Sequence, residues 1–197
     1  MLLTSGAVLQ KRNSGPGPAF GWFTDTRTET AMPAANLDKL FHDGLRDALY
    51  AEKKGLQALK KQARAARSPE LKQAFETHRD ETEGQIERLQ QVFETIGKRA
   101  SGKTCAALDG LAEEGEEIME EYKDSPALDA GLLGAAQAIE HYEIARYGTL
   151  AAWAKQLGNA EAERLLRETL AEEEKTDKLL TDLAESTINA AAEQQAA

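Results

Sequence analysis

Apolar residues after residue 35 recur three and four positions apart over long segments, which is the spacing of one face of an α-helix. Between these segments lie Gly, Pro, Ser, Thr and Asn, which typically begin or end helices. The pattern predicts five helices, running from about Asn36 to Arg67, Ser68 to Gly97, Thr104 to about Lys123, Ser125 to Gly158 and Asn159 to about Ser186.

The predicted ends of these helices also suggest how they are connected. Asn36, Thr104 and Asn159 are good cap residues, and Ser68-Pro69 and Ser125-Pro126 each place a cap before a proline in the first helical turn. The connections inside the first pair and inside the last pair are very short, so each pair should form an antiparallel hairpin. We therefore expect an all-α, ferritin-like four-helix bundle of two antiparallel hairpins, with a short fifth helix in the crossover.

The two ends of the chain differ from this helical body. Residues 1–35 are rich in Gly, Pro, Ser and Thr without periodicity, which predicts a disordered or loosely attached extension. The extension lacks the features of a signal peptide, and Met32 is expected to be the native start. The bundle is expected to span residues 36–187, and residues 188–197 are expected to fray.

Each long helix is apolar toward both ends and carries acidic or polar side chains in the middle of its apolar stripe. Glu143 and Glu173 each lie 15 residues from the turn at Gly158, so they should meet at one level of the bundle. The candidate residues of this layer are Glu52 in the first helix, Glu81 and Gln85 in the second, Glu140 and Glu143 in the fourth, and Glu173 and Asp177 in the fifth.

Several buried carboxylates repel one another and lose their hydration, and bound cations would offset much of this cost. Hard oxygen ligands suit iron or manganese, so the layer predicts a metal site inside the bundle. Each residue also has a simpler interpretation. Glu52 could pair with Lys or Arg, the run from Glu172 to Glu174 could face solvent, and His78 could be a hydrogen-bonded core histidine. The coincidence across four helices favours the metal.

The overall charge and composition agree with this picture. The formal net charge of −10 over 197 residues argues against nucleic acid as a partner and suits attraction of small cations. A single cysteine excludes an intrachain disulfide framework, and no apolar run is long enough to cross a membrane. We expect a cytoplasmic protein.

Two segments are recognisable, EHYEIARYGTL (140–150) and PELKQAFETHRDETEGQIERLQQVFE (69–94). Together with the other helices they resemble the YciF-type bacterial stress proteins of the ferritin-like superfamily over about residues 36–187. The resemblance implies a five-helix protomer, usually a homodimer, that is related in architecture to rubrerythrins. It also implies a di-iron carboxylate site with ferroxidase or peroxide-consuming capacity.

Carried onto this chain, the superfamily pattern places metal ligands at Glu52, Glu81, Glu140, Glu143 and Glu173, with Asp177 as a further candidate. The superfamily's usual Glu-x-x-His is missing, because Gly84 follows Glu81 and Thr176 follows Glu173 at that spacing. The residues expected to support the ligands by hydrogen bonding, or to replace a missing one, are His78, Gln85, His141 and Tyr50.

The leading hypothesis is that two iron ions per chain bind between the hairpins and that Fe(II) is oxidised by oxygen or peroxide. Glu81 and Glu173 would bridge the ions and Glu52 and Glu143 would be terminal ligands. A manganese catalase-like activity is the alternative within the same chemistry. The alternative from another class is a non-enzymatic, stress-protective dimeric scaffold.

Overall fold

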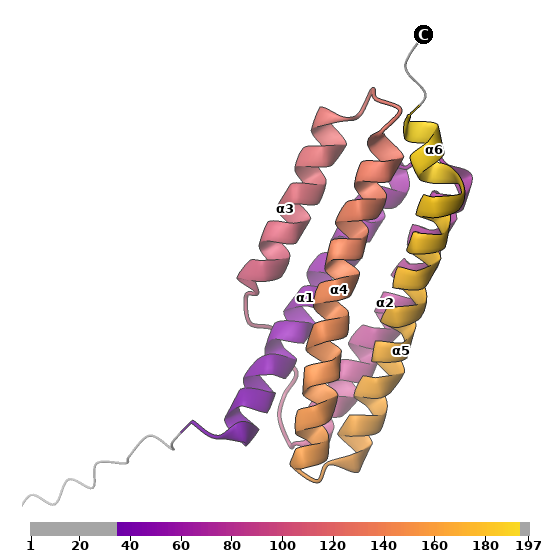
Figure 1. The fold of residues 1–197 in the computed structure, drawn as a ribbon. Coiled ribbons are helices and arrows are strands. Elements are labelled where there is room, and N and C mark those ends of the chain that lie inside the picture. Colours follow the sequence, from indigo (N-terminus) through magenta and orange to yellow (C-terminus); the bar gives the residue numbers. More distant parts are fainter. Residues whose placement is uncertain (1–34, 194–197) are drawn as a thin grey trace, which may run out of the picture. The chain divides into compact units, whose positions relative to one another are not determined.

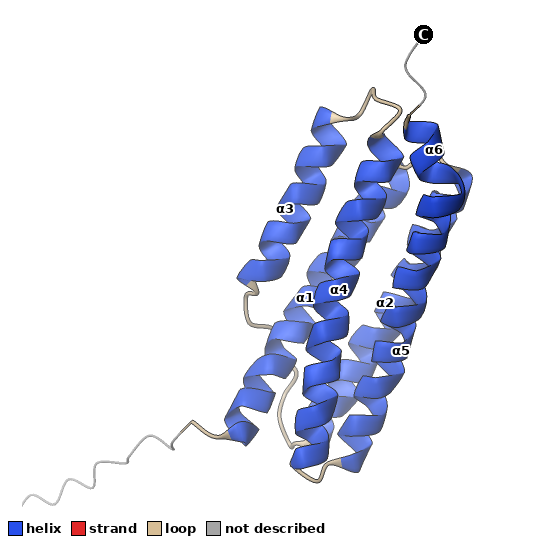
Figure 2. Cartoon of the chain, in the orientation of Figure 1, coloured by secondary structure: helices blue, strands red, loops and turns tan. Residues whose placement is uncertain are grey.

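The computed structural model describes residues 35–193; the expectations for residues 1–34, including the native start at Met32, and for residues 194–197 lie outside this range. All regular structure of the described residues is helical, which confirms the predicted all-α bundle (Figure 2). The helices are α1 (Leu37–Ala65), α2 (Pro69–Thr95), α3 (Ala106–Glu121), α4 (Leu128–Gln156), α5 (Ala160–Leu183), the π-helical turn η1 (Ala184–Ile188) and α6 (Asn189–Ala192).

Four long helices form the bundle, and the shorter α3 packs against its outside (Figure 1). Helices α1 and α2 make one hairpin and α4 and α5 make the other. Across the bundle, α1 packs against α4 and α2 against α5. Helix α3 lies in the crossover between the hairpins and contacts α1 and α4. The predicted arrangement of hairpins and crossover helix is therefore confirmed.

Most of the predicted helix ends are confirmed by hydrogen bonds. The side chains of Asn36, Ser68 and Asn159 accept hydrogen bonds from backbone N–H groups in the first turns of α1, α2 and α5. Gly97 and Gly158 have φ of 65° and 72°, the left-handed conformation in which glycine commonly follows the end of a helix. These local signals set the lengths of the two hairpins.

Two predicted caps are wrong. Helix α3 begins at Ala106 with Cys105 in the cap position, because the Cys105 side chain is buried against the bundle and the Cys105 carbonyl accepts the first helical hydrogen bond. Helix α4 begins at Leu128, because Ser125 belongs to a separate turn in which its Oγ accepts from the N–H of Ala127 at 3.1 Å. Thr104 and Ser125 therefore do not cap these helices.

Helical structure also continues beyond the expected end of the bundle. Residues 188–193 were expected to fray, but η1 and α6 extend the last helix to Ala192. Ile188 is only 4 % exposed and joins the apolar cluster that includes Leu71, Leu132 and Leu180. Burial of this isoleucine accounts for the longer helix, since it stabilises the end of the helix against solvent.

The core of the four-helix bundle has two large apolar clusters with a polar layer between them, as the sequence pattern predicts, and a third, smaller cluster with Cys105 and Leu108 packs α3 against the bundle. The cluster near the α4–α5 turn includes Phe41, Phe93 and Leu150, and the one near the α1–α2 turn includes Leu71 and Leu132. Each cluster removes large apolar side chains from water and stabilises the bundle on its side of the layer. The four helices are therefore held firmly above and below the polar residues.

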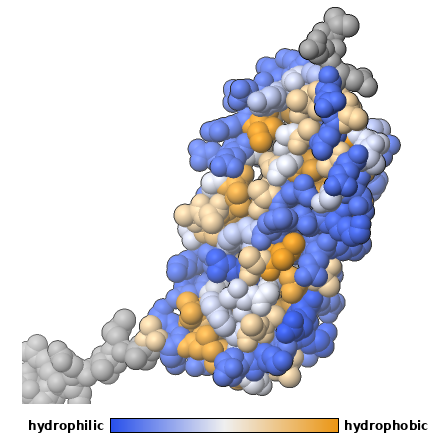
Figure 3. Space-filling model, in the orientation of Figure 1, coloured by the Kyte–Doolittle hydropathy of each residue, from blue (hydrophilic) through white to orange (hydrophobic). Residues whose placement is uncertain are grey.

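On the face shown in Figure 3, hydrophobic residues form separate groups among hydrophilic ones. Among the described residues, the exposed large hydrophobic side chains are Leu40, Tyr122 and Leu179, which belong to different parts of the fold. Over residues 35–193, no helix has both the length and the apolar character needed to cross a membrane.

Candidate metal centre

The buried positions of the four long helices follow one another at alternating steps of three and four residues. In α2, for example, the buried series is Leu71, Phe75, His78, Thr82, Gln85, Leu89 and Val92. Such a seam keeps one stripe of each helix facing its neighbours along the whole bundle. At mid-height the seam carries Glu52 in α1, His78 in α2, Glu140 and Glu143 in α4, and Glu173 in α5.

Four of these side chains converge on one point. His78, Glu140, Glu143 and Glu173 each present a ligand atom such that all four atoms lie within 4.8 Å of one another, and all four residues are buried. The His78 Nε2 lies 3.2 Å from Glu140 Oε1 and 3.4 Å from Glu173 Oε2. Three helices, α2, α4 and α5, therefore supply one compact group of imidazole and carboxylate ligands.

Glu52 of α1 stands beside this group and is 1 % exposed. Its Oε1 accepts a hydrogen bond from the hydroxyl of Tyr147, which is also buried, on α4. Glu52 lines the same cavity as His78, Glu140 and Glu143. The hydrogen bond from Tyr147 orients the Glu52 carboxylate. Helix α1 therefore also contributes a side chain to the layer formed by α2, α4 and α5.

Three carboxylate oxygens of the group lack protein hydrogen bonds among the described residues. Among residues 35–193, neither oxygen of Glu173 has a hydrogen-bond partner, and Glu140 Oε2 has none either. Buried polar atoms are nearly always hydrogen-bonded, so these orphaned oxygens require an explanation. Carboxylate and imidazole ligands at this spacing fit a transition-metal ion such as iron or manganese.

Electrostatics within the layer shows how strongly the carboxylates repel one another. Burial, followed by the charges of neighbouring glutamates, raises the pKa values of Glu143 and Glu173 well above the ordinary value of 4.5. Burial raises the pKa of Glu52 to about 7, although the hydrogen bond from Tyr147 lowers it. Without a metal, the layer therefore binds protons that a cation would displace.

His78 is the positive group that balances the carboxylates in the absence of metal. Burial lowers its pKa, but the charges and hydrogen bonds of Glu140 and Glu81 outweigh this effect and raise the pKa to about 10. Its Nδ1 lies 3.2 Å from the hydroxyl of Thr176 and 3.7 Å from Glu81 Oε2. Thr176 therefore lies on the far side of the ring and helps direct Nε2 toward the carboxylates.

Three of the predicted ligands lie outside the converging group: Glu52 stands beside it, whereas Glu81 and Asp177 lie at the flanks of their helices. Glu81 accepts a hydrogen bond from Lys175 at 2.8 Å, and His78 followed by Lys175 lowers its pKa to about 2. Asp177 lies 3.1 Å from His141 and accepts a hydrogen bond from Gln137. Both carboxylates are one helical position away from the seam, at the flanks of α2 and α5, where they reach cationic or polar partners instead of the core.

The residues predicted to support the ligands are also dispersed. Gln85 is fully buried, and its Nε2 donates to Glu172 at 3.1 Å while its Oε1 has no partner among the described residues. His141 is exposed on α4. Tyr50 donates to Asp109 at 2.8 Å and so ties α1 to α3. Of the predicted supporting residues, only His78 joins the converging group, where its Nε2 is one of the four atoms that could bind a metal ion.

Sequence reasoning assigned no role at the centre to Tyr147 and Thr176. Both lie on the buried seam at the polar level, Tyr147 one turn after Glu143 and Thr176 three residues after Glu173. The three-and-four spacing of the sequence places both residues on the inward-facing stripes of their helices. Their hydrogen bonds to Glu52 and His78 depend on contacts between helices.

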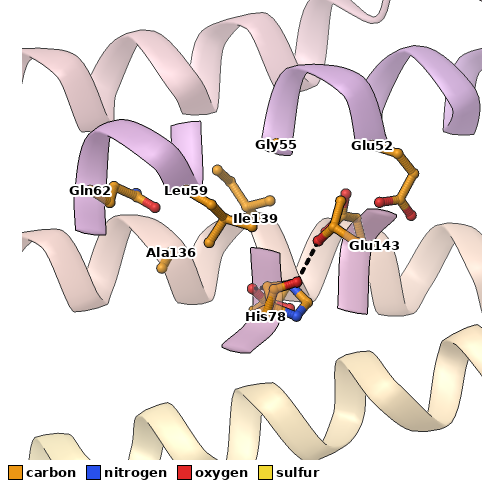
Figure 4. Close-up of a pocket in the computed structure, with 10 residues that line it drawn as sticks. Glu52, Gly55, Leu59, Gln62, His78, Ala136, Ile139 and Glu143 are labelled. Carbon is orange, nitrogen blue, oxygen red and sulfur yellow. Dashed lines mark hydrogen bonds and ion pairs between the residues drawn. The ribbon is translucent and has the colours of Figure 1, made fainter. Parts of the chain in front are cut away.

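A small cavity adjoins the group, with a free volume of about 10 Å³, enough for one water-sized molecule. Figure 4 shows Glu52, Gly55, Leu59 and Gln62 following one another beside Ile139 and Ala136, with Glu143 and His78 near the Glu52 end. Gly55 provides part of the space, since a Cβ at that position would lie 3.7 Å from Glu143 Oε1.

Comparisons with known proteins agree with the resemblance seen in the sequence. A family model described as a domain of unknown function, DUF892, matches residues 36–193. Protein YciF of Escherichia coli strain K12 is 46 % identical over 166 residues, covering 84 % of this chain and 100 % of that protein.

Solved structures show the same fold. The Escherichia coli stress protein YciF aligns with a TM-score of 0.75 at 46 % identity, covering 78 % of this chain and 98 % of that one. YcfI from Rhodopseudomonas palustris, provisionally described as a structural protein, aligns with a TM-score of 0.72 at 42 % identity, covering 77 % and 96 %. A protein of Xanthomonas campestris pv. campestris, at 24 % identity and a TM-score of 0.66, shares the fold over 81 % and 99 %.

Proposed function

This chain belongs to the DUF892 family, and on that premise we propose that it is a YciF-type stress protein that binds transition-metal ions inside its helical bundle. The observation that carries the proposal is the unpaired, buried carboxylate of Glu173. Its carboxylate is completely buried, neither oxygen has a hydrogen-bond partner among the described residues, and Glu140 and Glu143 crowd around it. A bound cation would supply the partner that these oxygens lack.

The proposed ligands are the Nε2 of His78 and the carboxylates of Glu140, Glu143 and Glu173, with Glu52 able to join from α1. His78 would take the part that the missing Glu-x-x-His histidine plays in the superfamily. Iron, when bound, supplies one-electron redox chemistry, and manganese is the alternative. The proposal extends to two ions per chain and to oxidation of Fe(II) or consumption of peroxide, with a manganese catalase-like activity as the variant.

The chain's own residues would contribute in three ways. The carboxylates give a negative, buried site that attracts small cations, and the apolar clusters above and below exclude bulk water. Tyr147 fixes Glu52, and Thr176 orients His78. Cation binding releases the proton from His78 and those held by the carboxyl groups, so the layer also takes up and gives out protons within the bundle.

A stress-protective scaffold is the second candidate. It is favoured by the provisional description of the relative YcfI as a structural protein, and by the ion pairs of protonated His78 with Glu140 and Glu173, which partly neutralise the layer without a metal. On the family resemblance alone, either function is proposed for a homodimer in the bacterial cytoplasm. Light scattering on the purified protein tests the homodimer.

The test is elemental analysis after anaerobic loading with Fe(II) and removal of free metal. We expect about two irons per chain in the parent protein and near none in a Glu143→Gln/Glu173→Gln variant. Glu172→Gln is the matched control, because the neighbouring Glu172 pairs with Arg88 outside the group. Equal iron in the parent and the double variant would exclude this centre. Absence of iron and manganese from the parent would favour the scaffold.

A further inference from the structure

A buried amide at the level of the carboxylate layer has a carbonyl oxygen without a partner among the described residues. Gln85 lies on the seam of α2 and is 0 % exposed, and its Oε1 forms no hydrogen bond within residues 35–193. Its Nε2 donates to Glu172 at 3.1 Å, and Arg88 donates to both oxygens of that carboxylate. Because an ionised carboxylate only accepts hydrogen bonds, the NH₂ end of the amide must face Glu172. The unpaired Oε1 is therefore turned away from Glu172.

The residues of the centre occupy two levels along the bundle. On the side of the α1–α2 turn, His78 of α2 forms its hydrogen bond with Thr176 of α5. On the side of the α4–α5 turn, Glu52 of α1 accepts its hydrogen bond from Tyr147, which follows Glu143 by one turn of α4. Figure 4 shows Glu143 between Glu52 and His78. The centre thus has a second level, marked by Glu52, beyond the group around His78.

Gln85 belongs to the level of Glu52. It follows His78 by seven residues, which keeps both on one face of α2 and moves Gln85 about 10 Å along the helix toward the α4–α5 turn. In the first hairpin, Glu52 lies 16 residues before Ser68 and Gln85 lies 17 residues after it, so the two residues meet at one height. The second level therefore offers a carboxylate from α1 and an amide carbonyl from α2.

The unpaired atoms of the layer require a positive partner. Among residues 35–193 they are Gln85 Oε1, Glu140 Oε2 and both oxygens of Glu173, and every one of them is a hydrogen-bond acceptor. A water molecule donates at most two hydrogen bonds and carries no charge, so it leaves the repulsion between the buried carboxylates in place. A cation bonds to several oxygens at once and also offsets that repulsion. It therefore accounts for the amide and the carboxylates together.

We infer that the second of the two ions binds at the level of Glu52 and that Gln85 Oε1 is one of its ligands, together with the carboxylates of Glu52 and Glu173. Glu173 is able to serve both ions, because neither of its buried oxygens has a hydrogen-bond partner among the described residues. Carboxylate and carbonyl oxygens suit a hard divalent cation such as Mn(II). The inference rests on the proposed function, and it gives the second ion an all-oxygen site that differs from the histidine-containing site of the first.

The first test is a titration of the metal-free protein with Mn(II), followed by elemental analysis and electron paramagnetic resonance. Gln85→Met keeps the side-chain length but replaces the carbonyl by a thioether, which is a poor ligand for a hard ion. We expect bound Mn(II) to fall from about two ions per chain to about one, and the spectrum of a coupled pair to give way to that of an isolated ion. Gln62→Met is the matched control, because it removes another buried amide of the seam and should keep both ions.

The outcomes separate the inference from the proposed function. Equal Mn(II) content and equal spectra in the parent and Gln85→Met overturn the inference, and so does a parent that binds one ion only. Both results leave the group around His78 as the proposed centre. A parent that binds no metal overturns the proposed function as well. Glu172→Gln should keep both ions, because its carbonyl oxygen still accepts the hydrogen bond from Gln85 Nε2.

The second test uses the parent chain itself, because Gln85→Met changes a fully buried position and could impair folding. Crystals of the parent are soaked with Mn(II), and anomalous diffraction then locates the ions. We expect two manganese peaks per chain, one at the group around His78 and one bonded to Gln85 Oε1. A second peak that has no contact with Gln85, or the absence of a second peak, overturns the inference.

Discussion

Replacing Glu173 by glutamine should separate two consequences of the buried carboxylate layer: the electrostatic cost in the metal-free protein and the binding of metal. Glutamine keeps the shape of the side chain but removes the charge that is crowded against Glu140 and Glu143. In the metal-free protein at pH 8, the variant should be more stable than the parent. It should also lose the stabilisation that metal confers on the parent, because an essential ligand is gone.

The expected magnitude follows from the burial of this residue. Glu173 is 0 % exposed and its oxygens have no hydrogen-bond partners among the described residues, so its charged form has little compensation beyond His78. Each pKa unit by which burial and the neighbouring glutamates raise the pKa of Glu173 costs the folded protein about 1.4 kcal/mol at a pH above that pKa, and glutamine removes this cost. For a domain of this size, each kcal/mol raises the melting temperature by roughly 2–4 °C. In the parent, metal at 100 times its Kd should add about 2.7 kcal/mol.

The assay is thermal unfolding of the parent, Glu173→Gln and the control Glu172→Gln, with and without metal. Glu172 accepts hydrogen bonds from Arg88 and Gln85 at the edge of the bundle, so Glu172→Gln should lose a little stability and keep the increment from metal. The reasoning is refuted if metal-free Glu173→Gln is less stable than the parent at pH 8. It is also refuted if Glu173→Gln retains the full increment from metal.

Three further predictions concern the groups around the centre. The pKa values of Glu52 and His78 are raised to about 7 and about 10, so the folded metal-free protein holds more protons than the unfolded chain across this range. Its stability to urea should therefore fall as the pH rises from about 5 to 10, and a flat profile would contradict these shifts. Thr176→Val should weaken metal binding about 10–100-fold in a competition titration because His78 loses its orienting hydroxyl, whereas Thr176→Ser should retain the affinity. The matched change Thr169→Val should also retain it, since that hydroxyl accepts a hydrogen bond from an arginine, and equal losses in the two valine variants would argue against the orienting role. Tyr147→Phe should destabilise the metal-free protein by about 1–2 kcal/mol in urea unfolding, because the buried Glu52 loses its donor, and unchanged stability would contradict this.

Much of the fold could be predicted because its determinants are local. Asn36, Ser68 and Asn159 sit at helix starts and Gly97 and Gly158 follow helix ends, and each acts through hydrogen bonds or backbone angles within a few residues. Short connections then impose the two hairpins. At the start of α3 the cap position depends on burial. The local sequence predicted Thr104 as the cap, but buried Cys105, one residue later, occupies that position.

The level of the polar layer was also determined by the sequence, because height along a helix follows directly from residue number. The choice among neighbouring carboxylates was not. Each residue turns the side chain by about 100° around the helix, so Glu81 and Asp177 at the flanks reach Lys175 and His141 while His78 and Glu173 point inward. The packing of adjacent helices decided which groups converge.

The sequence by itself determined an all-helical chain, its two hairpins and an acidic layer at mid-height, since periodicity, caps and spacing are properties of single segments. Only the tertiary structure decided that His78 joins the carboxylates, that Thr176 and Tyr147 support the centre, and that Gln62 ends an adjoining cavity. These features arise where side chains from different helices meet, and their distances depend on how the helices pack rather than on any one helix.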